Sequence, residues 1–285
     1  MTLTDIISQL SLTTLENSSE CERIIQRLVD AVFPLVWLHH PLEAGTIISR
    51  CRKDPSSLEK ESFSYKSVEK VQDFQRASIP HETVFYGAVG DRALEDGDFI
   101  AMLETSKLHR EGKTIGKEEI YVSNWKVKQN IDMAIICHPN VYANANPTGA
   151  VKAMQNNYRR RLLNYPCQAL LPEFDKLVKF VSCQFAKKVK DGDNHQYMIS
   201  AFFAHNSLET EAGIIYPSVQ VNGQLGFNVA LRPDIVDDYL DFVGAEKHIL
   251  YKATNYLQVP ANKYSAEHLA VSLGINSLDV LPKID

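Results

Sequence analysis

The sequence contains none of the short motifs that mark several common enzyme classes. It has no GxGxxG after a predicted strand, no GxxxxGK followed by Ser or Thr, no HExxH and no GxSxG. Doubly wound dinucleotide-binding sheets, P-loop nucleotide sites, zinc peptidases and serine hydrolases therefore lack their usual sequence support. If the chain binds a nucleotide, side chains must meet the phosphate charge, because no glycine-rich loop is present to do so.

Long apolar runs and targeting features are also lacking. The N-terminus, MTLTDIISQL, has no basic region and carries Asp5 within its apolar part, which argues against a secretory signal. The longest apolar run, residues 31–38, contains Pro34 and is too short to cross a bilayer. These features predict a cytoplasmic protein without a membrane partner.

The chain shows no excess of positive charge. Its formal net charge is −5 and its pI is about 6.0, so it offers no overall field for nucleic acid or anionic lipid. We therefore expect no direct nucleic-acid binding.

Metal-ligating and disulfide patterns are absent as well. The five cysteines are odd in number and form no Cys-x-x-Cys pair, which predicts reduced, mainly buried thiols. His39 and His40 are adjacent and no third ligand follows at a suitable spacing, so no metal site is expected. Cys137 and His138 resemble a nucleophile and its base, but neighbours on a strand face opposite sides, which favours a buried thiol.

The order of patterns along the 285 residues predicts a mixed α/β protein of the α+β class. Ser19 and Glu22 form a capping-box pattern that predicts a helix from about 20 to 33, ended by Pro34. Residues 1–45 are interpreted as an N-terminal helical extension of a domain spanning 46–285.

Within that domain, several strands lie too close in sequence for helical crossovers, which argues against a doubly wound sheet. Strands are predicted at TIISRC, ETVFYGAV, EEIYVSNWKVK, IDMAIIC, GIIYPSV, GFNVAL and HILYKATNYLQV, and helices at 98–106, 172–188 and 196–205. In the helix at 172–188, five apolar residues recur at the spacing of one helix face: Phe174, Leu177, Val178, Val181 and Phe185.

Residues 138–194 are predicted to form a helical insertion. The segment opens with an Asn- and Pro-containing stretch and includes Arg159, Arg160 and Arg161. Two interpretations stay open: a helical hairpin with a solvated basic face, or a lid or docking surface.

Five polar residues at the ends of predicted elements are candidates for one site: Arg50, Arg76, Tyr86, Glu104 and Ser218. Ser218 stands in the turn that follows a buried apolar strand, before a glycine-bearing return strand. Arg52 would face the same side of its strand as Arg50 and could share or take its role.

At these residues the chain resembles the RES-domain family. The matching stretches are IISRCR, FQRASIPHETVFYGA, FIAMLETS and GIIYPSVQVNGQLGFNVAL, in the family's order, over about residues 46–231. The sequence departs from the family at three positions around the second arginine. Gln75 replaces a glycine, Ala77 an aromatic residue and Ser78 an asparagine.

The resemblance implies an NAD-degrading toxin with a RES fold related to ADP-ribosyltransferases, a mixed sheet with flanking helices. It implies NAD as substrate, with phosphate or water as acceptor, and an Xre-type helix-turn-helix antitoxin as partner; a homodimer is compatible with it. The alternatives are an ADP-ribosyltransferase that modifies a protein, for which only the insertion argues, and a catalytically inactive RES-like binding module, for which the altered stretch around Arg76 argues.

The resemblance also implies roles for the candidate residues. Glu104 would stabilise the positive charge that develops on the ribose. Arg50 and Arg76 would bind the pyrophosphate, or one of them would orient Glu104. Tyr86 would stack on the nicotinamide, and Ser218 would contact the carboxamide or the ribose hydroxyls.

Overall fold

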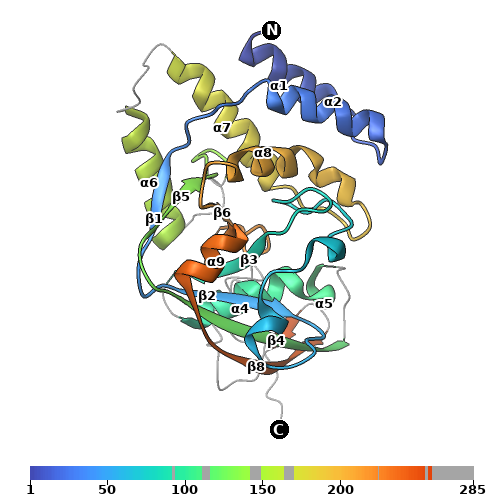
Figure 1. The fold of residues 1–285 in the computed structure, drawn as a ribbon, viewed down its shortest axis with the longest axis vertical. Helices are drawn as coiled ribbons and strands as arrows, with labels where there is room; N and C mark the ends of the chain where they lie inside the picture. Colours follow the sequence, from blue (N-terminus) through green and yellow to red (C-terminus); the bar gives the residue numbers. More distant parts are fainter. Residues whose placement is uncertain are drawn as a thin grey trace.

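The computed structural model describes residues 1–91, 94–110, 116–141, 149–163, 170–223, 225–253 and 256–258 (Figure 1). Over these residues the chain forms one mixed sheet with helices on both faces, which confirms the predicted mixed α/β class. The described strands are β1 (His39–Leu42), β2 (Ile47–Arg52), β3 (Phe85–Gly90), β4 (Gly116–Val127), β5 (Ile131–Ile135), β6 (Gly213–Pro217), β7 (Gly226–Leu231), β8 (Leu240–Ala253) and β9 (Tyr256–Gln258).

The sheet has the order β1-β5-β6-β7-β3-β2-β4-β8-β9 in the described residues. Strands β5 and β6 pair in parallel, and the other neighbouring strands pair antiparallel. The sequence-distant strands β7, β3 and β2 are therefore adjacent at the middle of the sheet. A group of side chains that leaves these strands on one side can form a common site.

The helices form two groups. The described helices are α1 (Leu3–Leu12), α2 (Ser19–Asp30), α3 (Lys60–Phe63), α4 (Leu94–Thr105), α5 (Lys107–Arg110), α6 (Gly149–Leu163), α7 (Leu171–Phe185), α8 (Met198–Leu208) and α9 (Pro233–Tyr239), with short 3-10 turns η1 (Val68–Lys70) and η4 (Asn194–Tyr197). Helices α1, α2, α7 and α8 gather at the N-terminal end of the molecule, whereas α4 lies near β2 and β3 (Figure 1).

Two hydrophobic cores correspond to these groups. The larger contains side chains of α2, α6, α7 and α8 with strands β5, β6 and β7. The smaller lies between α4 and the sheet and includes Phe99, Met102 and Leu103 of the helix with Ile120 and Val122 of β4. Burial of apolar surface on both faces holds the sheet between two layers.

Residues 1–45 contain the predicted helix α2, a further helix α1 and a strand, β1. Helix α2 begins after Ser18, whose hydroxyl accepts a hydrogen bond from the Cys21 amide at 3.2 Å. The predicted cap at Ser19 is thus wrong by one residue, and the helix ends at Asp30 instead of 33. Strand β1 pairs with β5, so this N-terminal part contributes to the main sheet as well as to the helical layer.

The insertion at 138–194 is mainly helical in its described parts. The five side chains predicted to share a face of α7 are all buried: Phe174, Leu177, Val178, Val181 and Phe185. Helix α6 also packs into the larger core, through Val151, Met154 and Tyr158. Arg159 and Arg160 are exposed, as a solvated basic face requires, and the side chain of Arg161 lies outside the described part.

Helix α4 approaches the sheet unusually closely because residue 97 is glycine. A Cβ at this position would lie 2.9 Å from the Ser49 hydroxyl of β2 and 3.1 Å from the Gly90 amide of β3. The absence of a side chain lets the helix rest directly on these strands. Its last turn, which carries Glu104, is thereby placed over the middle of the sheet.

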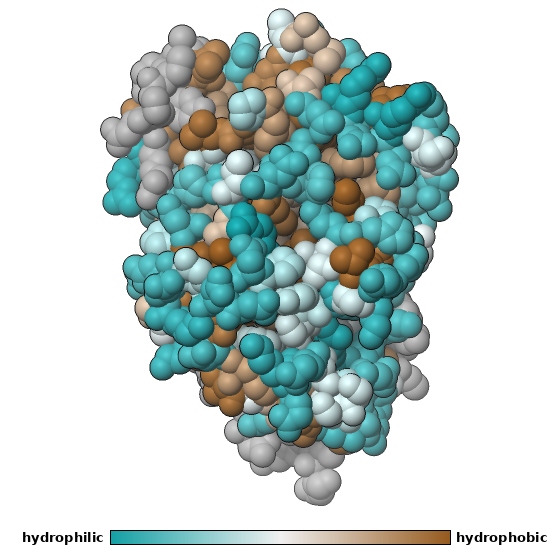
Figure 2. Space-filling model, in the orientation of Figure 1, coloured by the Kyte–Doolittle hydropathy of each residue, from teal (hydrophilic) through white to brown (hydrophobic). Residues whose placement is uncertain are grey.

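The molecular surface seen in Figure 2 is predominantly hydrophilic, with apolar side chains in patches separated by polar ones. Among the described residues, no helix combines the length and apolar character that a membrane crossing requires.

Candidate active site

A cleft of about 1000 Å³ opens over the middle of the sheet. Its walls come from β2, β3 and β7, from α4, and from the loops around residues 66–76 and 191–197. Five of the six predicted site residues line it: Arg50, Arg52, Arg76, Tyr86 and Glu104. The sixth, Ser218, lies behind the wall and is fully buried.

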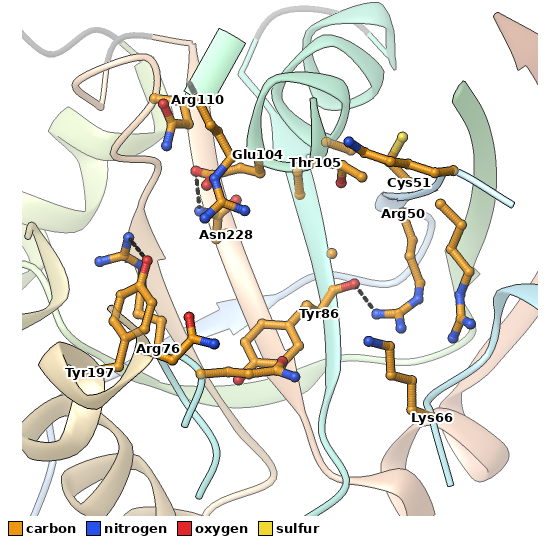
Figure 3. Close-up of a pocket in the computed structure, with 18 of the residues that line it drawn as sticks. Arg50, Cys51, Lys66, Arg76, Tyr86, Glu104, Thr105, Arg110, Tyr197 and Asn228 are labelled. Carbon is orange, nitrogen blue, oxygen red and sulfur yellow. Dashed lines mark hydrogen bonds between the residues drawn. The ribbon is translucent and has the colours of Figure 1, made fainter. Parts of the chain in front are cut away.

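Glu104 is held by two hydrogen bonds to the same carboxylate oxygen. Its Oε1 accepts from the Ser218 hydroxyl at 2.7 Å. The same oxygen accepts from the Asn228 side-chain amide at 2.9 Å (Figure 3). Within the described part of the chain, Oε2 makes no hydrogen bond. The carboxylate is thus oriented through one oxygen, and the other keeps its capacity for a ligand.

Ser218 and Asn228 come from two paired strands. Ser218 directly follows β6, and Asn228 stands opposite Tyr216 in the β6–β7 pair. The tight turn after Ser218 closes with a hydrogen bond from the Gly223 amide to the Ser218 carbonyl at 2.8 Å. The predicted direct contact of Ser218 with a substrate does not fit its complete burial. Its hydroxyl instead positions Glu104.

Tyr86 links two parts of the cleft wall. Its hydroxyl accepts a hydrogen bond from the Ala77 amide at 3.0 Å and shares one with the Ser78 hydroxyl at 2.9 Å. Burial raises the pKa of the Tyr86 phenol, which stays protonated at neutral pH. The backbone carbonyl of Tyr86 accepts from Arg50 Nη1 at 2.6 Å. Tyr86 therefore fixes the chain at residues 77–78 through its hydroxyl and Arg50 through its carbonyl.

We predict that Tyr86→Phe lowers the free energy of unfolding by about 1–3 kcal/mol, because it leaves the buried Ala77 amide without its acceptor. Chemical denaturation measures this. Tyr65→Phe is the matched control, since the Tyr65 hydroxyl bonds Asp237 at an exposed position, where the loss should stay within about 0.5 kcal/mol. Equal losses in both variants would contradict the anchoring role of Tyr86.

Arg76 joins the cleft to the insertion. Its Nη1 donates to the carbonyls of Phe185 and, at 3.0 Å, Lys187, at the C-terminal end of α7. The guanidinium carbon lies 4.9 Å from the centre of the Tyr197 ring, and Nη2 donates to the Tyr197 hydroxyl at 3.3 Å. A cation at a helix C-terminus is favoured by the helix dipole. Arg76 thus has a structural role in addition to its place in the cleft wall.

The altered stretch around Arg76 is an ordered reversal of the chain. The Gln75 amide bonds the Ser78 carbonyl at 2.9 Å, and the Ser78 amide returns to Gln75 at 3.4 Å. The Tyr86 hydroxyl stabilises this turn through its hydrogen bonds with the Ala77 amide and the Ser78 hydroxyl. The three positions that differ from the RES-family pattern, Gln75, Ala77 and Ser78, therefore lie in a turn that places Arg76 in the cleft wall.

The end of the cleft formed by β2, away from Arg76 and the insertion, is strongly cationic. Arg50 is buried, and burial together with the neighbouring Arg52 lowers its pKa to about 9. Burial also lowers the pKa of Arg52, whose Nη2 donates to the Ser64 carbonyl. Lys66 and Lys70 line the same end. A bound anion would relieve the repulsion among these groups.

The cations of this end lack carboxylate partners in the described part of the chain. Arg50, Arg52, Lys66 and Lys70 form no ion pair there, whereas the nearby Lys53 is paired with Glu118. In Figure 3, Arg50 and Lys66 lie on one side of Tyr86, and Glu104 with Asn228 lies on the other. The cleft therefore combines a cationic end with a separate, oriented carboxylate.

Sequence reasoning did not assign Asn228, Tyr197 or Lys66 to the site. Asn228 carries a signal that could have been used, because it is a polar residue inside the otherwise apolar GFNVAL strand and buried polar groups require partners. Tyr197 and Lys66 lie in a short turn and a loop, where no periodic pattern indicates which way a side chain points.

The residues set aside as chemistry candidates have other surroundings. Cys137 is a buried free thiol, as predicted, and burial raises its pKa to about 12. His138 contacts Asp175 through Nε2 at 3.2 Å. Cys21 is buried, Cys51 half-buried and Cys183 exposed, all as free thiols; Cys167 lies outside the described residues. No group of three or more metal-ligating His, Cys, Asp and Glu side chains occurs among the residues described.

Fold and site together define a mixed α/β protein whose cleft offers one oriented carboxylate, a cationic end and an aromatic wall. Comparison with protein-family models and with curated proteins gave no match.

Proposed function

We propose that the chain is a RES-type enzyme that cleaves the nicotinamide–ribose bond of NAD. The observation that carries the proposal is the division of the cleft: Glu104, oriented by two buried donors, lies apart from a cluster of cations. NAD carries the matching pair of features, a cationic nicotinamide ribose and an anionic pyrophosphate.

The chemistry requires little more than charge stabilisation. Breaking the nicotinamide–ribose bond leaves an oxocarbenium-like ribose, as in glycoside hydrolysis. The nicotinamide departs as a neutral molecule from a cationic state, so no general acid is needed. A single carboxylate placed at the ribose, here Glu104, lowers the barrier electrostatically. Ser218 and Asn228 keep that carboxylate in position before the reaction begins.

Binding of the dinucleotide is assigned to the other end. Arg50 and Arg52, two residues apart on β2, present guanidinium groups to the pyrophosphate, whose oxygens they can bind in bidentate fashion. Tyr86 between the two ends offers an aromatic face to the nicotinamide or its ribose. Arg76 and Tyr197 close the wall on the side of the insertion.

The test is incubation of the purified protein with NAD, with and without phosphate, while released nicotinamide and the ADP-ribose product are identified. We expect nicotinamide release without any protein acceptor, and a phosphorylated product if phosphate is the acceptor. Release that depends on an added protein would favour the ADP-ribosyltransferase alternative. If NAD remains intact under every condition, the enzyme proposal is wrong and a binding module takes its place.

The biological setting that follows is growth arrest through NAD loss in the cytoplasm. An Xre-type helix-turn-helix antitoxin would restrain the enzyme by covering the cleft. Expression of the chain alone should then deplete cellular NAD.

A further inference from the structure

The cationic end of the cleft carries more charge than a pyrophosphate requires. A dinucleotide pyrophosphate bears two negative charges, and Arg50 with Arg52 already supplies two positive ones. Lys66 and Lys70 line the same end and add two more. The lysines belong to the segment that Arg52 attaches to β2 through the Ser64 carbonyl.

We infer that Lys66 and Lys70 bind a phosphate monoester carried by the substrate in addition to its pyrophosphate. The inference rests on the proposed function and narrows its substrate class. The preferred substrate is a nicotinamide dinucleotide with a phosphate on the adenosine ribose, as in NADP.

Among the residues that the structure describes, no carboxylate forms an ion pair with Lys66 or Lys70. Asp54 and Asp73 also line the cleft, but in the described part of the chain neither forms an ion pair with a cation. Lys53 shows the contrast, because its ammonium group contacts Glu118. Partial burial and the like charges of Arg52, Arg50 and Lys70 lower the pKa of the Lys66 ammonium group. A dianionic phosphate would therefore be attracted to this group of cations.

The position of Lys66 argues against binding of the acceptor phosphate there. An acceptor must reach the ribose carbon next to Glu104. Lys66 and Glu104 lie on opposite sides of Tyr86 (Figure 3). A phosphate at Lys66 therefore belongs to a part of the substrate that is remote from the bond being cleaved.

Calorimetric titration tests the subsite without turnover. In the Glu104→Gln background, adenosine 2′,5′-bisphosphate should bind about 10-fold more tightly than 5′-AMP. Adding Lys66→Met should abolish this preference and leave the affinity for 5′-AMP within about 3-fold. Lys126→Met is the matched control, because Lys126 is exposed and lies outside the cleft lining.

Steady-state assays of the chain with an intact Glu104 provide a second readout. We expect kcat/KM to be higher for NADP than for NAD, and Lys66→Met to remove that difference.

Equal affinities for the two adenosine ligands, or a preference that survives Lys66→Met, would overturn the inference while leaving NAD cleavage standing. A rise in the KM for inorganic phosphate in Lys66→Met, with the NADP preference unchanged, would likewise overturn it and assign the lysines to the acceptor. A ligand preference that depends on Lys66 in a protein that cleaves neither dinucleotide would support the subsite and refute the proposed reaction.

Discussion

Glu104→Gln should reduce kcat/KM for NAD cleavage by about 100- to 1,000-fold, the range observed when one preorganised electrostatic group is removed from an active site. Glutamine has the same size, and its amide oxygen can still accept from Ser218 and Asn228. What is lost is the negative charge beside the ribose. Nicotinamide release measures the effect, and NAD titration should show binding within about 3-fold of the original.

Asp73→Asn is the control for this experiment. Asp73 is an exposed carboxylate that lines the same cleft, so the variant removes the same charge from the same cavity without touching the oriented group. We expect its activity within about 2-fold of the original chain. Comparable losses of activity in both variants would mean that Glu104 acts only through its contribution to the net charge of the cleft. In cells, the original chain and Asp73→Asn should deplete NAD, and Glu104→Gln should not.

The sequence predicted the parts of the fold in which burial imposes a regular pattern. Helix α7 shows this clearly, since each of its five predicted inward positions is buried. Strand β8 shows the opposite. It was predicted to begin at His248 but begins at Leu240. Its first half was missed because residues 241–247 are exposed or half-buried and are held by backbone pairing with β4. Such pairing leaves little trace in side-chain pattern.

The prediction of helix boundaries was limited by a different factor. Helix α1 was not assigned separately, although Thr2 and Asp5 form a reciprocal capping box. At α2, two consecutive serines both fit a cap, and backbone geometry selects Ser18. Several short polar residues near a helix start can match the capping pattern in the sequence, but only one of them has the backbone geometry of the cap.

The candidate site was predictable as a set of residues but not as a set of contacts. Arg50, Arg52, Arg76, Tyr86 and Glu104 do share a cleft. The role of each residue depends on hydrogen bonds between segments far apart in the chain. Ser218 meets Glu104 across 114 residues and Arg76 meets Phe185 across 109, separations at which local patterns carry no information.

The buried pair of donors behind Glu104 leads to a second large effect. Ser218→Ala and Asn228→Leu each remove one hydrogen bond to the carboxylate. A hydrogen bond to a charged group contributes about 1.5–3 kcal/mol, so each variant should lower kcat about 10-fold and the double variant about 100-fold. KM should stay within about 3-fold, because neither side chain is assigned to substrate binding.

A double-mutant cycle separates positioning of Glu104 from a general contribution to the fold. If the two donors act only by orienting the carboxylate, Ser218→Ala and Asn228→Leu should change kcat by less than about 2-fold in the Glu104→Gln background, because the charge they orient is already gone. If they merely support the β6–β7 turn, the same fold-loss should appear in both backgrounds, together with a lower Tm. Kinetics and thermal unfolding of the single and combined variants thus decide whether the strand–turn–strand around Ser218 serves the reaction or only the structure.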